Sequence, residues 1–398
     1  MQARNLMVLV GCQLISATST TTLVTLGGII GTSLTSNKAL VTLPMSLMVV
    51  AIAATAVPAS MLMRRIGRRR GFMLASVCAS AGMFIGVMAL KNSSFELFCM
   101  ATMMLGVNMA FTQQYRYAAA ESVPPEYVGR AISFVLLGPI GGAFLAKELA
   151  TRGQDWIAAI PYGGVLAGLG VLLLLQALLM SLLHEPTAHA EHAVEPSDRP
   201  LKQIVRQPVF LTAVIGGVAA YGIMTLIMTA TPLSMHLTEG YSIEETSSVI
   251  RAHVLAMYLP SLAAGFLIDR VGVTRLMMVG AVGLLATSII GMQGQSFMHY
   301  WWALVLLGIG WNFLYVGGTT LLTYTYSMAE RFHAQAVNEF LVFGMSAAAS
   351  LLAGTVMFYF GWRTLMLVPV PVLFAITLAL VLVRKDPLLH RRLAKEEG

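Results

Sequence analysis

Two asparagines lie deep inside apolar stretches of the sequence, where a polar side chain is costly to bury in lipid without a use. Asn108 and Asn312 each stand 13 or 14 residues from one end of their stretch, which places both side chains roughly 20 Å below a helix end. A carboxamide at this depth can donate and accept hydrogen bonds to a neutral solute. Trp311 and Tyr315 lie close to Asn312, and aromatic rings beside polar groups suit a planar organic molecule. The alternative is that the asparagines only join neighbouring helices by hydrogen bonds.

Ionisable side chains inside apolar stretches are the candidates for moving protons or for holding one end of the protein closed. His253 is the candidate proton carrier, because the reference pKa of histidine is near neutral. A hydrogen-bonded packing role would place the same residue there. Glu148 and Glu339 are the acidic residues that fall inside the apolar stretches, each near one end. To hold one end of the protein closed by an ion pair, Glu148 and Glu339 would each need a basic partner.

The cysteines and histidines form no recognisable metal or catalytic pattern. Cys12, Cys78 and Cys99 lie in apolar runs without CxxC or CxH spacing, so we expect buried thiols rather than disulfides or a zinc site. Three histidines between positions 184 and 192 match no standard ligand set and fit a solvated linker better. The patterns HExxH, GxSxG and GxxxxGK[ST] do not occur. We therefore expect no metal, no cofactor and no enzymatic activity.

The elements that carry these residues are predicted to be membrane-spanning helices. Hydrophobic residues make up 57% of the 398-residue chain and charged residues 11%, whereas soluble proteins carry about a quarter charged residues. Charges, glycines and prolines divide the sequence into apolar runs, each near the roughly 20 residues that a bilayer requires. These twelve runs cover residues 6–33, 39–63, 71–90, 95–115, 129–150, 157–183, 208–234, 247–268, 274–293, 298–325, 336–358 and 361–383.

Positively charged residues gather on one side of the predicted helices. Most of the 25 Lys and Arg residues fall in loops on the side of the N-terminus, which is the pattern of cytoplasmic loops. This predicts a multi-pass protein of a bacterial-type inner membrane with both termini in the cytoplasm. The net charge of +7 then reflects contact with the lipid bilayer and needs no nucleic-acid partner.

The chain divides into two related halves. Residues 65–67 match residues 270–272 at an offset of 205, and residues 106–111 match residues 310–315 at an offset of 204. Repeated matches at nearly one offset predict two six-helix bundles of the same topology. One long polar stretch separates the halves. We therefore expect an N-terminal bundle over residues 1–183, a cytoplasmic linker with a short amphipathic segment over 184–207, and a C-terminal bundle with a cytoplasmic tail over 208–398.

The loop after the eighth run carries the motif Gly265-Phe-Leu-Ile-Asp269-Arg270-Val-Gly272-Val-Thr-Arg275. It resembles the G-x-x-x-D-R-x-G-x-x-R loop signature of the major facilitator superfamily, and a partial copy with Arg64 in place of the acid follows the second run. The stretch Trp311-Asn-Phe-Leu-Tyr315-Val-Gly-Gly318 is also similar to bacterial carriers of the riboflavin-uptake type. The resemblance implies an all-α membrane protein with 12 transmembrane helices, arranged as two six-helix bundles related by pseudo-two-fold symmetry.

The resemblance also implies where the candidate residues meet. In the superfamily fold the first, fourth, seventh and tenth spans line a central cavity, so the expected solute site comprises Gln13, Asn108, Gln113, Trp311, Asn312 and Tyr315. The loop signature implies a latch of Arg65, Asp269 and Arg270. Facing spans would form an inner gate from Arg64 and Glu339 and an outer gate from Glu148 and Arg251. The alternatives are arginines that only fix topology and outer charges that reach separately to water.

These features predict a secondary active transporter that moves a small organic solute by alternating access. Without a nucleotide-binding motif the energy must come from a gradient, and the family resemblance favours protons. Gly138-Pro139-Ile140-Gly141-Gly142 is similar to the G-P-x-x-G-G element of proton-driven drug exporters but is one residue short, so drug or metabolite export is an alternative. A transport-inactive sensor with the same fold is another. We expect a monomer to be sufficient for function.

Overall fold

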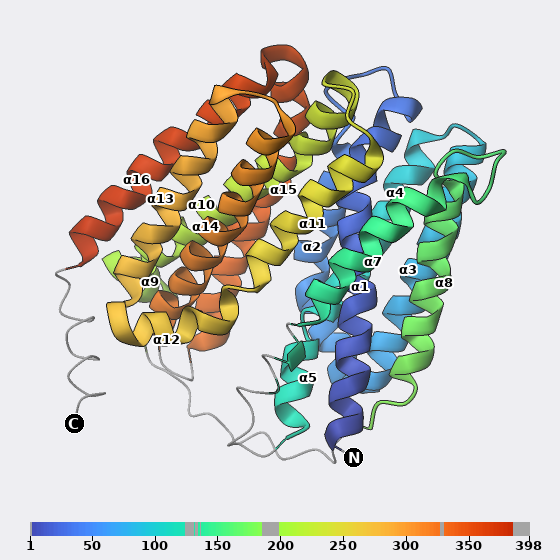
Figure 1. The fold of residues 1–398 in the computed structure, drawn as a ribbon. Helices are drawn as coiled ribbons and strands as arrows, with labels where there is room; N and C mark the ends of the chain where they lie inside the picture. The colour runs from blue at the N-terminus through green and yellow to red at the C-terminus, as the bar shows by residue number, and fades with distance from the viewer. Residues whose placement is uncertain are drawn as a thin grey trace.

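The computed structural model describes residues 2–123, 131, 134–135, 137–184, 199–326 and 330–384, which are almost entirely helical (Figure 1). The first part of the chain forms α1 (Gln2–Leu34), α2 (Leu43–Ile66), α3 (Arg68–Lys91), α4 (Phe95–Thr112), α5 (Tyr115–Glu121), α7 (Gly138–Arg152), η2 (Gly153–Asp155) and α8 (Gly163–Met180). The second part forms α9 (Leu201–Val205), α10 (Pro208–Pro232), η3 (Leu233–Thr238), α11 (Ile243–Tyr258), α12 (Ser261–Val271), α13 (Val273–Gln293), α14 (Phe297–Thr323), α15 (Arg331–Leu367) and α16 (Pro369–Val383).

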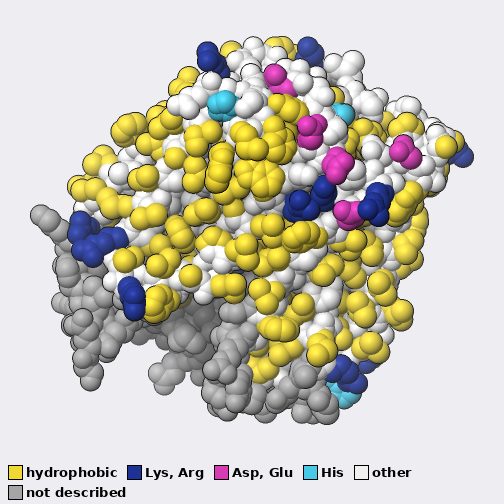
Figure 2. Space-filling model, in the orientation of Figure 1, with side chains coloured by type: hydrophobic (Ala, Val, Ile, Leu, Met, Phe, Trp, Pro, Cys, Tyr) yellow, Lys and Arg dark blue, Asp and Glu magenta, His cyan; other side chains and the backbone are white. Residues whose placement is uncertain are grey.

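Ten stretches of described helix are long and apolar enough to cross a membrane. The last covers residues 333–383 and contains both of the final predicted runs, with a break in the helix at Gly361, where φ is 78° and ψ is 171°. The predicted run at 129–150 is not among them, since its described helix, α7, has 15 residues. Figure 2 shows hydrophobic side chains over most of the visible face, which is what contact with lipid tails requires.

The helices pack in two groups. Helices α1 to α4, α7 and α8 contact one another extensively, and helices α10, α11 and α13 to α16 do the same. The groups lie side by side in Figure 1, blue to green beside yellow-green to red. Contacts between them run mainly through α2 with α15 and α7 with α11, with smaller ones from α1 to α10 and α11. The start of α1 and the end of α16 lie toward the same end of the molecule (Figure 1).

The internal repeat has a matching backbone conformation in both groups. Gly67 precedes α3 with φ 86° and ψ 155°, and Gly272 precedes α13 with φ 86° and ψ 148°. A positive φ is readily adopted by glycine and is strained for other residues. The second matched pair packs at helix crossings: a Cβ atom on Gly106 would lie 2.2 Å from the Met48 carbonyl oxygen, and one on Gly310 would lie 2.8 Å from that of Gly280. Both repeated motifs therefore fix helix geometry.

The connection between the halves is described only from residue 199. Residues 185–198, which include two of the three linker histidines, lie outside the described residues. The predicted amphipathic segment forms the short helix α9, in which Ile204 is buried and Leu201 is exposed. Arg199 ties this segment to the second group through Glu330 at 2.7 Å and the Thr325 carbonyl at 2.7 Å.

Candidate solute-binding cavity

A cavity of about 210 Å³ lies between the two groups of helices. The first group contributes side chains from α1, α2, α4 and α7, and the second from α10, α11 and α15. No described side chain that lines the cavity is charged. Hydroxyl groups and methionines make up most of the lining: Ser16, Thr20, Thr21, Thr112, Thr225, Thr229, Ser346 and Ser350, with Met45, Met48, Met109, Met224, Met228 and Met257. Such a surface suits an uncharged solute and adapts to its shape.

An aromatic cluster forms one wall of the cavity. Tyr221 of α10, Tyr258 of α11 and Phe343 of α15 line the cavity directly. Trp311 and Tyr315 of α14 stack on each other at 5.1 Å and 17°, and both meet the Tyr221 ring edge to face, at 5.3 and 4.9 Å. The predicted Trp311 and Tyr315 therefore stand behind the wall and hold Tyr221 in place. Sequence reasoning missed Tyr221, although it is an aromatic residue with a hydroxyl midway along a run expected to line the cavity.

Gln13 and Gln113 do line the cavity, as predicted from the family resemblance. Gln13 is half-buried on α1 and Gln113 is exposed at the end of α4. The glycines of the exporter-like sequence pack against α1: a Cβ atom on Gly138 would lie 2.8 Å from Cβ of Gln13, and one on Gly142 would lie 2.7 Å from the Leu14 carbonyl oxygen. These glycines therefore allow α7 to pack closely against α1.

Asn108 does not line the cavity. It is fully buried within the first group, where its Oδ1 accepts a hydrogen bond from Gln176 Nε2 at 3.4 Å. The same Gln176 nitrogen lies 2.8 Å from Ser76 Oγ and 3.1 Å from the Tyr115 hydroxyl. Asn108 thus belongs to a polar network between α3, α4, α5 and α8. Its depth was predicted, but the face of α4 that carries it points into the group.

Asn312 is also turned away from the cavity. Its Nδ2 donates to the Met257 carbonyl oxygen at 2.7 Å and to Ser261 Oγ, and its side chain is 1% exposed. Both acceptors flank Pro260, where α11 gives way to α12. Proline has no N–H to continue the helical hydrogen bonding. Asn312, on the neighbouring helix α14, therefore stabilises the break between α11 and α12. This is the alternative role of joining neighbouring helices by hydrogen bonds.

Replacing Asn312 with alanine is expected to lower stability without changing the affinity for solute. The change removes a donor to a buried carbonyl, which costs about 1 kcal/mol within a membrane protein. Thermal unfolding of the purified protein should show a lower Tm, and Ser261→Ala should give a smaller decrease, because the Met257 bond remains. A lower solute affinity at unchanged Tm would instead place Asn312 in the binding site.

His253 lies in the interface between α11 and α14. Its ring is fully buried, and Nδ1 donates to the Leu304 carbonyl oxygen at 2.8 Å. A Cβ atom on Gly308 would lie 2.7 Å from the His253 carbonyl oxygen, so the two helices are in close contact. Tyr258 of the same helix lines the cavity and His253 does not. Its placement is that of a packing residue and gives no support to a proton-carrying role.

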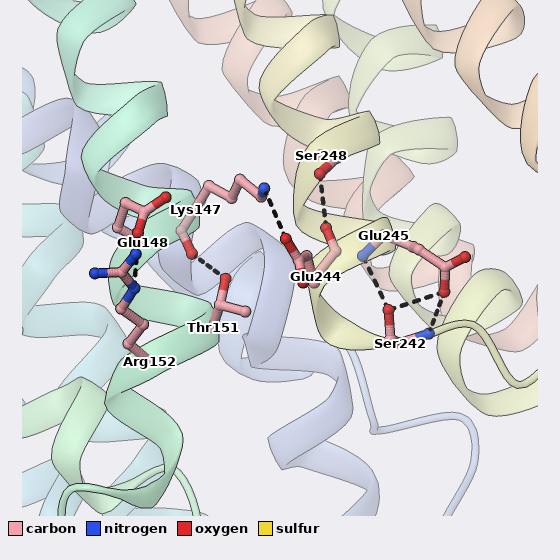
Figure 3. Close-up of polar contacts among 8 residues, drawn as sticks. All are labelled: Lys147, Glu148, Thr151, Arg152, Ser242, Glu244, Glu245 and Ser248. Atoms are coloured by element: carbon pink, nitrogen blue, oxygen red, sulfur yellow. Dashed lines mark hydrogen bonds and ion pairs between the residues drawn. The ribbon is translucent and has the colours of Figure 1, made fainter.

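Between α7 and α11 the structure shows a different ion pair from the predicted one. Lys147 Nζ lies 3.1 Å from Glu244 Oε1 across the groups (Figure 3). Glu148, expected to pair with Arg251, instead pairs with Arg152 one turn along its own helix at 3.0 Å. The Arg251 guanidinium lies 5.1 Å from the centre of the Phe144 ring. Because successive helical residues point about 100° apart, Lys147 and Glu148 take different partners, Glu244 of α11 for Lys147 and Arg152 of the same helix for Glu148.

The start of α11 is fixed by its own sequence. Ser242 Oγ accepts from the Glu245 backbone N–H at 3.1 Å, and the Glu245 carboxylate accepts from the Ser242 N–H at 2.9 Å (Figure 3). This reciprocal arrangement is a capping box. It places Glu244 in the first turn of α11, opposite Lys147.

At the other end of the molecule the predicted latch is only partly described. The side chains of Arg64 and Asp269 lie outside the described residues, so the Arg64–Glu339 gate stays a prediction. Arg65 is exposed, and Arg270 lies 4.3 Å from the ring centre of Phe266 on its own helix. Among the contacts of described residues, neither Arg65 nor Arg270 meets a residue of the opposite group.

Glu339 is half-buried on α15, four residues before Phe343 of the aromatic wall. It interacts electrostatically with Tyr221 and Tyr315, and its carboxylate receives a hydrogen bond from the side chain of Asn338. Arg116, which belongs to α5 of the first group, interacts electrostatically with both Glu339 and Tyr315. Sequence reasoning did not consider Arg116 as the partner of Glu339, because it follows the predicted fourth run directly and resembled a topology-fixing charge.

The cavity opens at the end where α1 begins. Positions 56–58 and 60–62 of α2 are all exposed. Together they cover roughly 240° of the helix circumference, which is more than the side that faces lipid, so part of this exposed surface faces the opening between the two groups. On α15, Phe340 is 73% exposed and no atom lies within 4 Å of a Cβ placed on Gly344. At the opposite end the groups touch, with Thr42 Oγ1 donating to the Leu351 carbonyl at 3.2 Å.

Known proteins match this chain over nearly its whole length. The sequence model of the Major Facilitator Superfamily matches residues 9–250 and 224–398. The riboflavin transporter RfnT of Brucella anthropi is 35% identical over 380 residues, which cover 95% of each chain. The uncharacterized MFS-type transporter YdeG of Bacillus subtilis is 29% identical over 352 residues, 84% of this chain and 81% of its own.

Solved structures share the fold. A bacterial homolog of the human lysosomal transporter Spinster, in an inward-facing conformation, has a TM-score of 0.75 at 14% identity and covers 96% of each chain. The nucleoside transporter NupG has a TM-score of 0.70 at 12% identity, covering 96% of this chain and 99% of its own. The whole-length family match and the 35% identical relative agree with this fold. The chain therefore belongs to the Major Facilitator Superfamily and is a membrane transporter rather than an enzyme.

Proposed function

We propose that this protein carries riboflavin, or a closely related uncharged flavin, across the membrane by alternating access. The observation that carries the proposal is the cavity itself, whose described lining is uncharged and has an aromatic wall on one side. A flavin is a flat, neutral ring system with polar groups on its edge, and it would bury its faces against such a wall. The 35% identity to a riboflavin transporter points to the same solute class.

The proposed transport mechanism uses two six-helix bundles, 12 transmembrane helices in all, related by a pseudo-two-fold axis. The first bundle comprises residues 1–183 and the second residues 208–398, with 184–207 as the linker. The matching glycines at 67 and 272 support this symmetry. Because the cavity is lined from both groups within one chain, a monomer is sufficient. The two bundles would rock about the bound solute, closing one end as the other opens.

The proposed location is the inner membrane with both termini in the cytoplasm. The basic residues of the loops support this orientation by the positive-inside rule. The cavity opens at the end where α1 begins, so the structure would then correspond to the inward-open state. Release into the cytoplasm would follow from this state in an uptake cycle.

Proton coupling would act through Glu339 rather than His253. Glu339 is the acidic residue that interacts with the aromatic wall and, across the bundles, with Arg116. Protonation would remove its charge and so weaken its attraction to the Arg116 guanidinium. A proton bound at Glu339 would thereby change the balance between the open and closed forms of this end.

The test is uptake by a bacterial strain that cannot make or import riboflavin. Cells that express this chain should accumulate labelled riboflavin and grow at low external concentrations. Flavin mononucleotide should be excluded, because its phosphate would be buried against an uncharged lining at a high desolvation cost. Correctly inserted protein that accumulates no riboflavin, in cells or in proteoliposomes, would overturn the proposed function.

A further inference from the structure

The cavity is chemically asymmetric. Among the described residues, the aromatic side chains that line the cavity come from the second group of helices: Tyr221, Tyr258 and Phe343. The carboxamides in the same described lining, Gln13 and Gln113, come from the first group. A solute in this cavity therefore meets an apolar, flat surface on one side and two amide groups on the other.

The hydroxyl groups beside these carboxamides are already engaged within the protein. Ser16 Oγ and Thr112 Oγ1 lie 3.0 Å apart, and Thr20 Oγ1 donates to the Ser16 carbonyl at 3.0 Å. In sequence, Gln13 precedes Ser16 by about one helical turn and Gln113 follows Thr112 directly, so the two carboxamides flank this hydroxyl pair. The amide groups of Gln13 and Gln113 can therefore form hydrogen bonds to a solute, whereas the neighbouring hydroxyls already form hydrogen bonds within the protein.

The two carboxamides themselves have no hydrogen-bond partner among the described residues. The stem of Gln13 is held by α7, since a Cβ atom on Gly138 would lie 2.8 Å from its Cβ and 2.9 Å from its Cγ. The next glutamine, Gln114, contrasts with them: its Nε2 lies 3.4 Å from Ser60 Oγ, and it is not part of the lining. Gln13 and Gln113 are therefore carboxamides of the first bundle that can bind a solute.

A carboxamide offers one acceptor and two donors in a plane. This pattern is complementary to an imide edge, in which an N–H group lies between two carbonyl groups. We propose that Gln13 and Gln113 select solutes with an imide edge, while the ring of the solute packs on Tyr221 and Phe343. The imide edge is present in the flavin ring and also in uracil and thymine bases. This proposal deepens the proposed function and rests on it only for the identity of the ring.

The experiment compares ligands that differ in the imide nitrogen alone. Riboflavin and N3-methylriboflavin would be titrated against purified protein by flavin fluorescence, and uridine and 3-methyluridine would be titrated directly by calorimetry. The variants are Gln13→Met and Gln113→Met, which keep an unbranched stem at both positions; the stem of Gln13 packs near Gly138. Gln114→Met is the matched control outside the cavity. Tyr221→Leu tests the aromatic wall, and thermal unfolding confirms that each variant is folded.

Wild-type protein is expected to bind riboflavin about tenfold or more tightly than the N3-methyl form, because methylation removes the donor of a hydrogen bond to the carboxamides and puts a methyl group in its place. Gln13→Met or Gln113→Met should abolish most of this preference by weakening riboflavin alone. Tyr221→Leu should weaken both ligands equally, and Gln114→Met should change neither.

Three results would decide against one or both proposals. Equal affinity of wild-type protein for riboflavin and its N3-methyl form, or glutamine variants that weaken both forms equally, would overturn the imide proposal and leave riboflavin transport standing. Binding of uridine but not riboflavin, with the same sensitivity to methylation, would overturn the flavin assignment and support the imide proposal. Binding of neither ligand pair would overturn both.

Discussion

Replacing Glu339 with glutamine is expected to abolish the accumulation of riboflavin against its gradient while leaving exchange of riboflavin across the membrane intact. The substitution keeps the size of the side chain and removes its ability to gain and lose a proton. It also removes the negative charge that acts on Arg116, Tyr221 and Tyr315. A carrier without its proton site can still alternate with solute bound, but the proton gradient no longer biases its direction.

The measurement uses proteoliposomes with an imposed pH gradient. Wild-type protein should concentrate labelled riboflavin inside, whereas Glu339→Gln should only equilibrate it, and counterflow with internal riboflavin should proceed in both. His253→Gln is the matched control, because His253 is buried between α11 and α14 and should not affect coupling. Gradient-driven accumulation at the wild-type level by Glu339→Gln would show that the coupling proton binds elsewhere.

The helices were largely predictable, because a membrane-spanning helix is recognised from the apolar composition of a long stretch of sequence. A run of about 20 apolar residues has few options other than spanning a bilayer. Several helix boundaries are set by residues with specific backbone or capping roles. Gly67 and Gly272 take the same positive φ, and Ser242 with Glu245 forms a capping box. Gly361, the first residue of the last predicted run, also has a positive φ of 78°.

The candidate site was less predictable from the sequence. Counting residues along a helix gives the depth of a side chain in the membrane, but it does not show whether the side chain points toward the cavity or into the helix bundle. Asn108 and Asn312 lie well inside α4 and α14, yet both are buried within their own group of helices. In a bundle with lipid on one side and a cavity on the other, helices such as α4 and α14 have little hydrophobic asymmetry that would reveal the inner face. Gln13 and Gln113 line the cavity, and they were proposed from the family resemblance, which supplies the lining helices that periodicity does not.

The charged pair between α7 and α11 shows the same limit at the scale of one residue. Counting along straight helices placed Glu148 and Arg251 at similar depths, and the structure does bring α7 and α11 together there. A shift from Glu148 to Lys147 turns the side chain by about 100°, which is enough to replace one pair by another. Sequence also does not specify which end of a two-state carrier is closed, since both states use the same chain.

Joining Thr42 to Gly354 by a disulfide is expected to abolish transport while leaving solute binding intact. These residues lie at the closed end, where Thr42 of the first group donates to the Leu351 carbonyl of α15. A Cβ atom on Gly354 would lie 3.1 Å from Thr42 Oγ1, close to the distance of about 3 Å that separates one cysteine Cβ from the sulfur of its partner in a disulfide. The variant Thr42→Cys with Gly354→Cys should therefore cross-link without moving the backbone.

A cross-link at this position holds the two bundles together at the end that must open for the other half of the cycle. The two states of a carrier differ by a few kcal/mol, so noncovalent contacts there exchange readily, but a covalent bond does not open thermally. The change would be made after replacing Cys12, Cys78 and Cys99 with alanine. Oxidation should reduce riboflavin transport to background, a reducing agent should restore it, and neither single cysteine variant should respond. Riboflavin should still bind the oxidised protein, because the cavity remains accessible from the other end. Transport at the unmodified rate by fully cross-linked protein would mean that this end does not open during transport.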